Sequence, residues 1–483
     1  MTLLPAPEYN GVSMSDENKT PAGAADFKRF LRTDLSAAAF LAEHAAGPAI
    51  LTRAPGRLDV MGGVADYSGS LVAEMTIAEA ALVALAPRSD RTLRVWSRGI
   101  EAEGFAPQVS ISLNDFYSPD GSGTLLSYDA VRSLLCCDPQ TRWAAYLLGC
   151  VYVLLAEGAA PDFPQGANLL LDSRVPLGAG VSSSAAIEVA AMSALNAAFH
   201  LNLDGVTVAR LSQRVENKVV GAPCGIMDQM TSALGVPNSL LLILCQPHEV
   251  QGTQALPDGV KIYGINSGVK HSVGGSAYTR ARVAAFMGRK LLGEATGRDL
   301  PYVVQCSTRM YESVERAGVL PKTVLGSDFL ALHGETGDPV THVDPATEYP
   351  VKASTEHAIY ENLGVTMFVR TLAATKTDEA QLVRAGRFMY LSHDSYTRIG
   401  LGCPETDLLV QLGRAAGLGK GIYGAKITGG GSGGTVAFLT DGERAAQTVH
   451  EIAEAYGAQT GRTPQVFEGG LSPGAMAFGS EQL

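Results

Sequence analysis

The segment VPLGAGVSSSAAIEVA, residues 175–190, constrains the fold of this chain more than any other stretch. It follows a strand-like run, turns on glycines and small residues, and opens a strongly helical segment with three serines. Glycines let the backbone approach a ligand, and a helix N-terminus presents unpaired N–H groups that favour an anion. The spacing fits neither a Walker A loop nor a dinucleotide-binding turn. Alone, the segment indicates an anion at a helix start, and Ser182 acting only as a helix cap is the simpler alternative.

A second glycine-rich bend lies near the C-terminus. KITGGGSGGTVAFL, residues 426–439, has five glycines around Ser432 just before an apolar strand. Such a density of glycine is conformationally costly unless something approaches the backbone closely.

Carboxylates suited to phosphoryl transfer lie in two further segments. VENKVVGAPCGIMDQM, residues 215–230, contains Glu216 and Asp228 on either side of a glycine-containing bend. Two carboxylates beside a phosphate site suit one Mg²⁺ ligand and one group that faces the acceptor hydroxyl. RLDVMGGVADYSGS, which begins at Arg57, adds that arginine and Asp66. The four segments together favour a phosphoryl-transfer site over a plain helix cap.

Composition narrows the class of protein. The chain has 483 residues and a net charge of −11, which predicts two domains and argues against a nucleic-acid partner. Seven cysteines without a repeated CxxC predict reduced thiols and a cytoplasmic protein. The longest apolar run, residues 143–156, is shorter than the ~18 residues of a membrane span, and no signal peptide is visible, so no membrane partner is expected.

Strand-like and helical segments interleave along the whole chain, which predicts a two-domain α+β protein with a cleft between the domains. Residues 1–25 are polar and rich in turn formers, and we expect a disordered tail there. The domains are expected at residues 26–255 and 256–483.

The four segments resemble the motifs of the GHMP kinases, the superfamily of galactokinase, homoserine kinase, mevalonate kinase and phosphomevalonate kinase. APGRLDVMGGVADYSGS is similar to the first motif, PLGAGVSSSAA to the second and KITGGGSGGTVAFL to the third. GAPCGIMDQM and INSGVKHSVGGSAY are similar to galactokinases in particular. The resemblance covers roughly residues 50 to 480. It implies the two-domain GHMP kinase fold, an active site in the interdomain cleft, and phosphorylation that uses ATP and Mg²⁺.

The resemblance also implies roles for single residues. Asp228 matches the aspartate beside the anomeric hydroxyl and Arg57 the arginine that pairs with it. A carboxylate already paired with a cation is a weak base, so Asp228 either abstracts the proton or mainly orients the hydroxyl. Glu216 and Ser184 match the Mg²⁺ ligands. The phosphate cradle is matched by Gly178, Gly180, Ser182, Ser183 and Ser184, and the sugar contacts by Asp66, Gly225, Tyr278 and the third-motif glycines, Gly430 among them.

One departure bears on the substrate. Galactokinases carry Glu-His where this chain has Gly63-Val64, and that glutamate accepts the hydroxyl on the exocyclic carbon of the sugar. L-Arabinopyranose has the ring stereochemistry of galactopyranose without the exocyclic CH₂OH, so Gly63 fits a five-carbon sugar. The plant L-arabinokinases resemble this sequence more closely here, and the implied product is β-L-arabinose 1-phosphate. The alternatives are a galactokinase making α-D-galactose 1-phosphate, a galacturonate kinase and a sugar sensor without turnover. The exocyclic carboxylate of galacturonate would need a cation where Gly63-Val64 stands, and the intact second motif disfavours the sensor.

Three further residues have alternative roles. Trp96 suits either adenine stacking or the core, and the sequence does not locate the adenine pocket. Arg280 and Arg282, on the helix after Tyr278, are expected to be solvated rather than to bind substrate.

Overall fold

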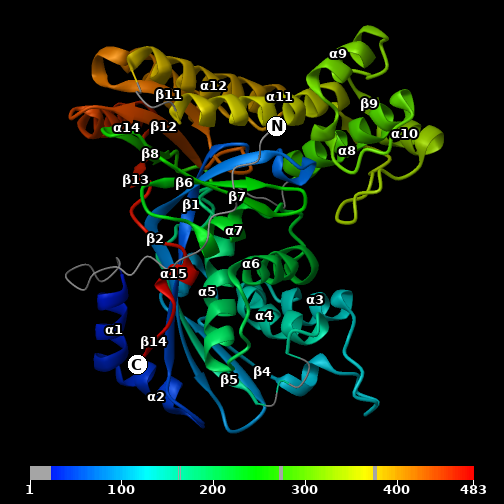
Figure 1. The fold of residues 1–483 in the computed structure, drawn as a ribbon. Coiled ribbons are helices and arrows are strands. Elements are labelled where there is room, and N and C mark those ends of the chain that lie inside the picture. The colour runs from blue at the N-terminus through cyan, green and yellow to red at the C-terminus, as the bar shows by residue number, and fades with distance from the viewer. Residues whose placement is uncertain (1–22, 161–162, 164, 271–275, 374–377) are drawn as a thin grey trace.

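The computed structural model describes residues 23–160, 163, 165–270, 276–373 and 378–483, and Figure 1 shows how their helices and strands are arranged. Two β-sheets organise this part of the chain, one in each half of the sequence. In the described ranges, no helix is both long enough and apolar enough to cross a membrane.

The larger sheet has eight strands in the described residues, in the order β14-β1-β2-β5-β3-β4, with β6 paired to β2 and β7 to β6. β3 and β5 are parallel, and the other neighbours are antiparallel. β14, at the C-terminus, pairs with β1, so the chain ends on the sheet of its N-terminal half. The strands are β1 (Ile50–Met61), β2 (Leu71–Pro87), β3 (Thr92–Ser97), β4 (Gln108–Ser112), β5 (Ala167–Ser173), β6 (Ser239–Leu244), β7 (Glu249–Ala255) and β14 (Glu481–Gln482).

Helices cover both faces of this sheet. On β2, Leu82 packs in the apolar cluster of α1 and α2, whereas its neighbour Val83 belongs to the main core on the other face. Adjacent strand residues point to opposite faces, so a nearly uninterrupted apolar run such as β2 requires cover on both. Figure 1 shows α5 running alongside the sheet. These helices are α1 (Ala24–Thr33), α2 (Leu35–Ala42), α3 (Tyr128–Cys136), α4 (Ala145–Ala156), α5 (Ser183–Ala198), α6 (Gly205–Arg214), α7 (Met227–Leu234) and α15 (Ala475–Phe478).

The second sheet has the order β11-β12-β8-β13, and helices α13 and α14 supply part of its apolar core. α11 and α12 lie side by side at the top of Figure 1. The strands are β8 (Val260–Asn266), β11 (Ile422–Ile427), β12 (Thr435–Asp441) and β13 (Gln465–Glu468). The helices are α8 (Ser276–Thr296), α9 (Thr308–Arg316), α10 (Gly326–His333), α11 (Val351–Leu372), α12 (Glu379–Arg398), α13 (Pro404–Ala416) and α14 (Ala445–Thr460), and β9 (Val324–Leu325) pairs with β10 (Glu348–Tyr349).

A buried ion pair joins the two halves of the chain. Lys426 at the end of β11 donates to Asp59 of β1 over 2.7 Å, and both side chains are fully buried. The Asp59 backbone N–H donates to the Thr428 hydroxyl over 2.7 Å. Because a buried charge is tolerated only with a partner, this pair fixes the glycine-rich loop after β11 against β1.

Candidate active site

One cavity of about 390 Å³ brings together residues from both halves of the chain. Of the predicted site residues, Gly63 alone does not line it. Those that line it are Arg57, Asp66, Gly178, Gly180, Ser182, Ser183, Ser184, Glu216, Gly225, Asp228, Tyr278 and Gly430. The four motifs therefore meet in space, as the phosphoryl-transfer interpretation requires.

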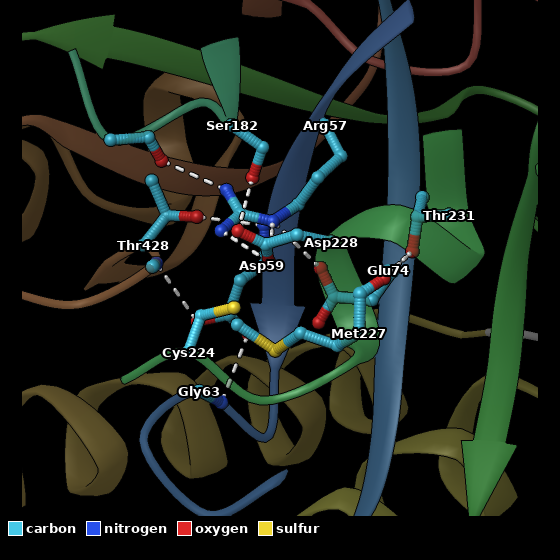
Figure 2. A network of polar contacts seen from close by, with 12 residues as sticks. Arg57, Asp59, Gly63, Glu74, Ser182, Cys224, Met227, Asp228, Thr231 and Thr428 are labelled. Carbon is cyan, nitrogen blue, oxygen red and sulfur yellow. Dashed lines mark hydrogen bonds and ion pairs between the residues drawn. The ribbon is translucent and has the colours of Figure 1, made fainter. Parts of the chain in front are cut away.

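Asp228, in the first turn of α7, forms the polar centre of the cavity (Figure 2). Its Oδ1 accepts from Arg57 Nε at 2.9 Å and Nη2 at 2.8 Å, and its Oδ2 accepts from the Ser182 hydroxyl at 2.6 Å. Arg57 also donates through Nη1 to the Gly180 carbonyl over 2.8 Å. Charge-assisted bonds of this kind hold both side chains in one geometry. The Asp228 side chain keeps 20% exposure, so it is open to a ligand in the cavity.

Glu74 contacts Arg57 and does not line the cavity in the described chain. Its carboxylate is 3.4 Å from Arg57 Nε, and the side chain is fully buried. Neither of its oxygens has a hydrogen-bond partner among the described residues. Burial and the Asp59 carboxylate raise the pKa of Glu74 well above its usual range. Burial would lower the pKa of Arg57, but the carboxylates of Asp228, Glu74 and Asp59 outweigh it and raise that pKa.

The glycine loop before α5 has the backbone that a close ligand requires. Gly178 and Gly180 have φ of 72° and 73°, and Ser182 has φ of 61°. Ser182 makes no side-chain capping bond to α5, because its hydroxyl donates to Asp228 instead. The simple helix-cap interpretation of Ser182 is therefore wrong, and the N–H groups at the start of α5 lie at the cavity.

Glu216 and Ser184 form an oxygen-rich pair. The Ser184 hydroxyl donates to Glu216 Oε1 over 2.8 Å, and Gln229 Nε2 donates to Glu216 Oε2 over 2.6 Å. Glu216 lies on a π-helical turn, Val215–Val220, a local distortion often found at functional sites. Burial, and then Asp228, raise the pKa of Glu216 to about 7. A bound cation would relieve this unfavourable charge.

The other end of the cavity is suited to hydroxyl groups. Asp66 Oδ1 is buried and has no hydrogen-bond partner among the described residues. Burial and Asp228 raise the pKa of Asp66 to about 6. Gly225 passes so close that a Cβ there would lie 1.6 Å from Asp66 Oδ2, so only glycine fits. A buried acceptor without a donor is costly, and a polyhydroxy ligand would supply the donor.

Gly63 faces away from this end. A Cβ on Gly63 would meet the Tyr396 hydroxyl and the Asp59 carboxylate. Its neighbour Val64 lines the cavity instead, with a left-handed φ of 59° that a β-branched residue rarely adopts. Val64 packs with Tyr278 in one apolar cluster. Val64 therefore supplies apolar surface to the cavity beside Tyr278, although the sequence analysis considered it only as the companion of Gly63.

Arg282 is a second residue whose environment the sequence did not predict. Its guanidinium donates to both Asp338 oxygens, at 2.7 and 2.8 Å, and to the Pro223 carbonyl at 3.1 Å. The side chain is buried, so the expectation of a solvated Arg282 is wrong. The sequence did offer one signal for the burial of these charges. Arg282, Asp59 and Lys426 are each a charged residue in an otherwise apolar pattern.

A larger cavity, of about 810 Å³, adjoins the phosphate loop. Four residues line both cavities: Arg142, Tyr146, Leu177 and Val220. Trp96 does not line the second cavity in the described chain; it packs edge-on against Phe40, with ring centroids 5.5 Å apart. Of the two roles considered for Trp96, the core role is confirmed.

Comparison with known proteins identifies two family regions. Residues 145–236 match the GHMP kinases N terminal domain, and residues 373–459 match the GHMP kinases C terminal family. An L-arabinokinase of Arabidopsis thaliana is 41% identical over 89% of this chain, which spans 46% of the length of that protein. A galactokinase of Chloroflexus aggregans is 33% identical over 86% of this chain and 90% of its own length.

The fold has a close counterpart among solved structures. Lactococcus lactis galactokinase, solved with galactose, superposes with a TM-score of 0.71 over 95% of this chain and 99% of its own. The identity is 19%, so this similarity concerns the fold. It confirms the predicted α+β arrangement of two domains.

Proposed function

This chain belongs to the GHMP kinase family, and we propose that it transfers the γ-phosphoryl group of ATP to the C1 hydroxyl of a monosaccharide. The observation that carries the proposal is the Asp228 carboxylate, held by Arg57 and Ser182 beside a glycine-lined helix N-terminus. Phosphoryl transfer needs mainly positioning and charge stabilisation, and this arrangement supplies both.

In the proposed reaction the C1 oxygen forms a bond to the γ-phosphorus while the bond from that phosphorus to the β–γ bridging oxygen breaks and ADP leaves. Asp228 accepts a hydrogen bond from the C1 hydroxyl and orients its oxygen toward phosphorus. Arg57 offsets the negative charge that develops between the donor and acceptor oxygens. The hydroxyl proton leaves to Asp228 or to water.

Magnesium would be held by Glu216 and Ser184. Their oxygens are 2.8 Å apart, and hard oxygen ligands are those that Mg²⁺ prefers. In the described ranges, no group of three or more histidine, cysteine, aspartate or glutamate side chains is arranged for a metal. Mg²⁺ usually takes one or two protein ligands and completes its shell with water and phosphate. The ion would neutralise phosphate charge.

The adenosine half of ATP would occupy the 810 Å³ cavity, because that cavity continues from the phosphate loop. It is lined by apolar and aromatic side chains such as Trp143 and Phe105, and aromatic faces suit a purine.

L-Arabinose is the substrate that we propose, with β-L-arabinose 1-phosphate and ADP as products. Two observations support it: the apolar Val64 at the sugar end and 41% identity to an L-arabinokinase. An exocyclic CH₂OH placed against Val64 would receive no hydrogen bond from that side chain. D-Galactose is the second candidate, and the galactokinase relative supports it.

The decisive experiment compares kcat/KM for L-arabinose, D-galactose and D-galacturonate by ATP consumption. We expect L-arabinose to give the highest value. A higher value for D-galactose would refute the substrate, and no turnover with any sugar would favour the sugar-sensor alternative.

We propose the cytoplasm as the compartment. All seven cysteines are free thiols, as expected for a reducing environment.

A further inference from the structure

A third cavity, of about 580 Å³, adjoins the sugar end of the active site. Asp66, Cys224 and Gly225 line both cavities and therefore form the wall between them. The other walls come from α6 with its π-helical extension, from α8, and from the loop after α10 (Figure 1). The proposed phosphoryl transfer gives this cavity no role.

The lining is strongly cationic, although the chain as a whole has a net charge of −11. Only two acidic side chains, Asp66 and Asp338, line the cavity in the described chain. Asp338 is already paired with Arg282, and Asp66 belongs to the wall shared with the active site. The cationic residues of the lining are Arg210, Arg214, Lys218, Arg282 and Arg289.

Three of these cations form no ion pair in the described chain. Within the described ranges, no carboxylate oxygen lies within 4.0 Å of the charged nitrogens of Arg210, Lys218 or Arg289. Burial, and then the charge of Arg210, lower the pKa of His248, which also lies in the lining. The charges of Asp338 and Asp299 act on Arg289 from beyond 4.0 Å. The cations of the lining still outnumber its carboxylates, and an anionic ligand would relieve their mutual repulsion.

Arg289 is fixed in place before any ligand arrives. Its guanidinium donates to the Pro301 carbonyl over 3.0 Å and to the Thr336 carbonyl over 2.9 Å. Its central carbon lies 4.9 Å from the ring centroid of Phe286. A preorganised guanidinium loses little freedom on binding and matches the oxygens of a phosphate group.

The helical spacing places the remaining cations together. Arg210, Arg214 and Lys218 are separated by four residues each, and Gln213 and Asn217 lie between them on the same face. Arg282, Phe286 and Arg289 form a similar row on α8. Arg282 is already used by Asp338 and the Pro223 carbonyl, so the groups that can hold a phosphate from two sides are Arg210 and Lys218 on one helix and Arg289 on the other.

We propose that this cavity is a second binding site, for a small phosphate monoester. Its volume falls in the range of small-molecule sites, its guanidinium groups suit phosphate oxygens, and its amides and Tyr67 suit hydroxyl groups. The site does not depend on which sugar is phosphorylated, so it can be tested by binding alone.

The test is calorimetric titration of the full chain with glycerol 3-phosphate. The protein is first saturated with Mg²⁺ and an ATP analogue that cannot be hydrolysed, so that the phosphate loop is occupied. We expect binding to the wild type, weakened tenfold or more in Arg210→Ala/Lys218→Ala and in Arg289→Met. Arg384→Ala, an exposed charge on α12, is the matched control and should bind as the wild type does.

Absence of binding to the wild type would overturn the proposal. Equal affinity in the wild type and the cavity variants would overturn it too, since the probe would then bind elsewhere. The double variant removes two side chains without acidic partners in the described chain, so it keeps the test valid if Arg289→Met fails to fold.

Discussion

A Cβ on Gly63 would lie 2.0 Å from the hydroxyl oxygen of Tyr396. That hydroxyl donates to the Gly429 carbonyl over 2.7 Å, so a tyrosine of α12 links the loop after β1 to the loop after β11. His357 Nε2 donates to the Gly63 carbonyl over 3.0 Å on the same side. The glycine is therefore required by packing, whatever its bearing on the substrate.

Gly63→Ala should destabilise the protein by about 1–3 kcal/mol, because an added methyl group would displace Tyr396. Urea unfolding measures this difference. Gly47→Ala is the control, since a Cβ there would meet nothing within 4 Å. We expect Gly63→Glu to lose activity toward both sugars rather than to switch between them. Wild-type stability of Gly63→Ala would show that Tyr396 moves aside freely.

The sequence predicted the site as a set of motifs, because glycines and serines next to helix and strand patterns are local signals. It correctly predicted that Asp228, Arg57 and the second-motif serines meet, and the structure gives their hydrogen bonds. The direction in which a side chain at position 63 would point could not be predicted, because it depends on where α12 packs. The same holds for Asp59 with Lys426 and for Arg282 with Asp338, pairs that are far apart in the sequence.

Val64→Gly should raise kcat/KM for D-galactose relative to L-arabinose by about tenfold. Removing the side chain opens the apolar wall of the sugar end, and glycine adopts the left-handed φ of 59° without strain, which offsets part of the lost packing. The measurement is the ratio of kcat/KM for the two sugars. Val220→Ala, which changes the nucleotide end of the cavity, should leave the ratio unaltered. An unchanged ratio in Val64→Gly would exclude Val64 as the residue that discriminates between them.

Asp228→Asn should keep sugar affinity within a few-fold and lower kcat by about a thousandfold. The amide preserves the shape of the side chain but removes the charge that Arg57 and Ser182 hold in place. Equilibrium sugar binding and turnover are measured on the same preparation. Ser182→Ala should lower kcat only by about tenfold, because the Arg57 contact to Asp228 stays. Unchanged turnover in Asp228→Asn would remove Asp228 from the reaction.

Glu74→Gln should make the protein more stable than the wild type at pH 7.5, with a smaller difference at pH 5. The folded-state pKa of Glu74 is raised, so the folded protein holds a proton that the unfolded chain releases above pH about 4.5. The contribution of this group to stability is therefore full below that pH and decreases as pH rises. Glutamine has the shape of the protonated acid but does not titrate, so this pH dependence of the free energy of unfolding is lost. Urea unfolding at both pH values measures it, with the exposed Glu43→Gln as control. Equal pH dependence in wild type and Glu74→Gln would contradict the prediction.

Asp66 should give kcat/KM for the sugar an acidic limb near pH 6. Above its raised pKa of about 6 the carboxylate is ionised, and both oxygens accept hydrogen bonds from sugar hydroxyls. Below that pH one oxygen carries a proton, so an acceptor is lost and kcat/KM falls as the pH decreases.

The measurement is kcat/KM from pH 5 to pH 8 at saturating ATP and Mg²⁺, where the cation holds Glu216 ionised and removes its titration from the profile. Asp66→Asn should have a lower kcat/KM that no longer changes around pH 6, because an amide does not titrate. A limb that persists in Asp66→Asn would assign it to another group. Tyr278→Phe, a change on the same wall of the cavity, should keep the limb, which separates loss of the titrating carboxylate from general damage to the sugar end.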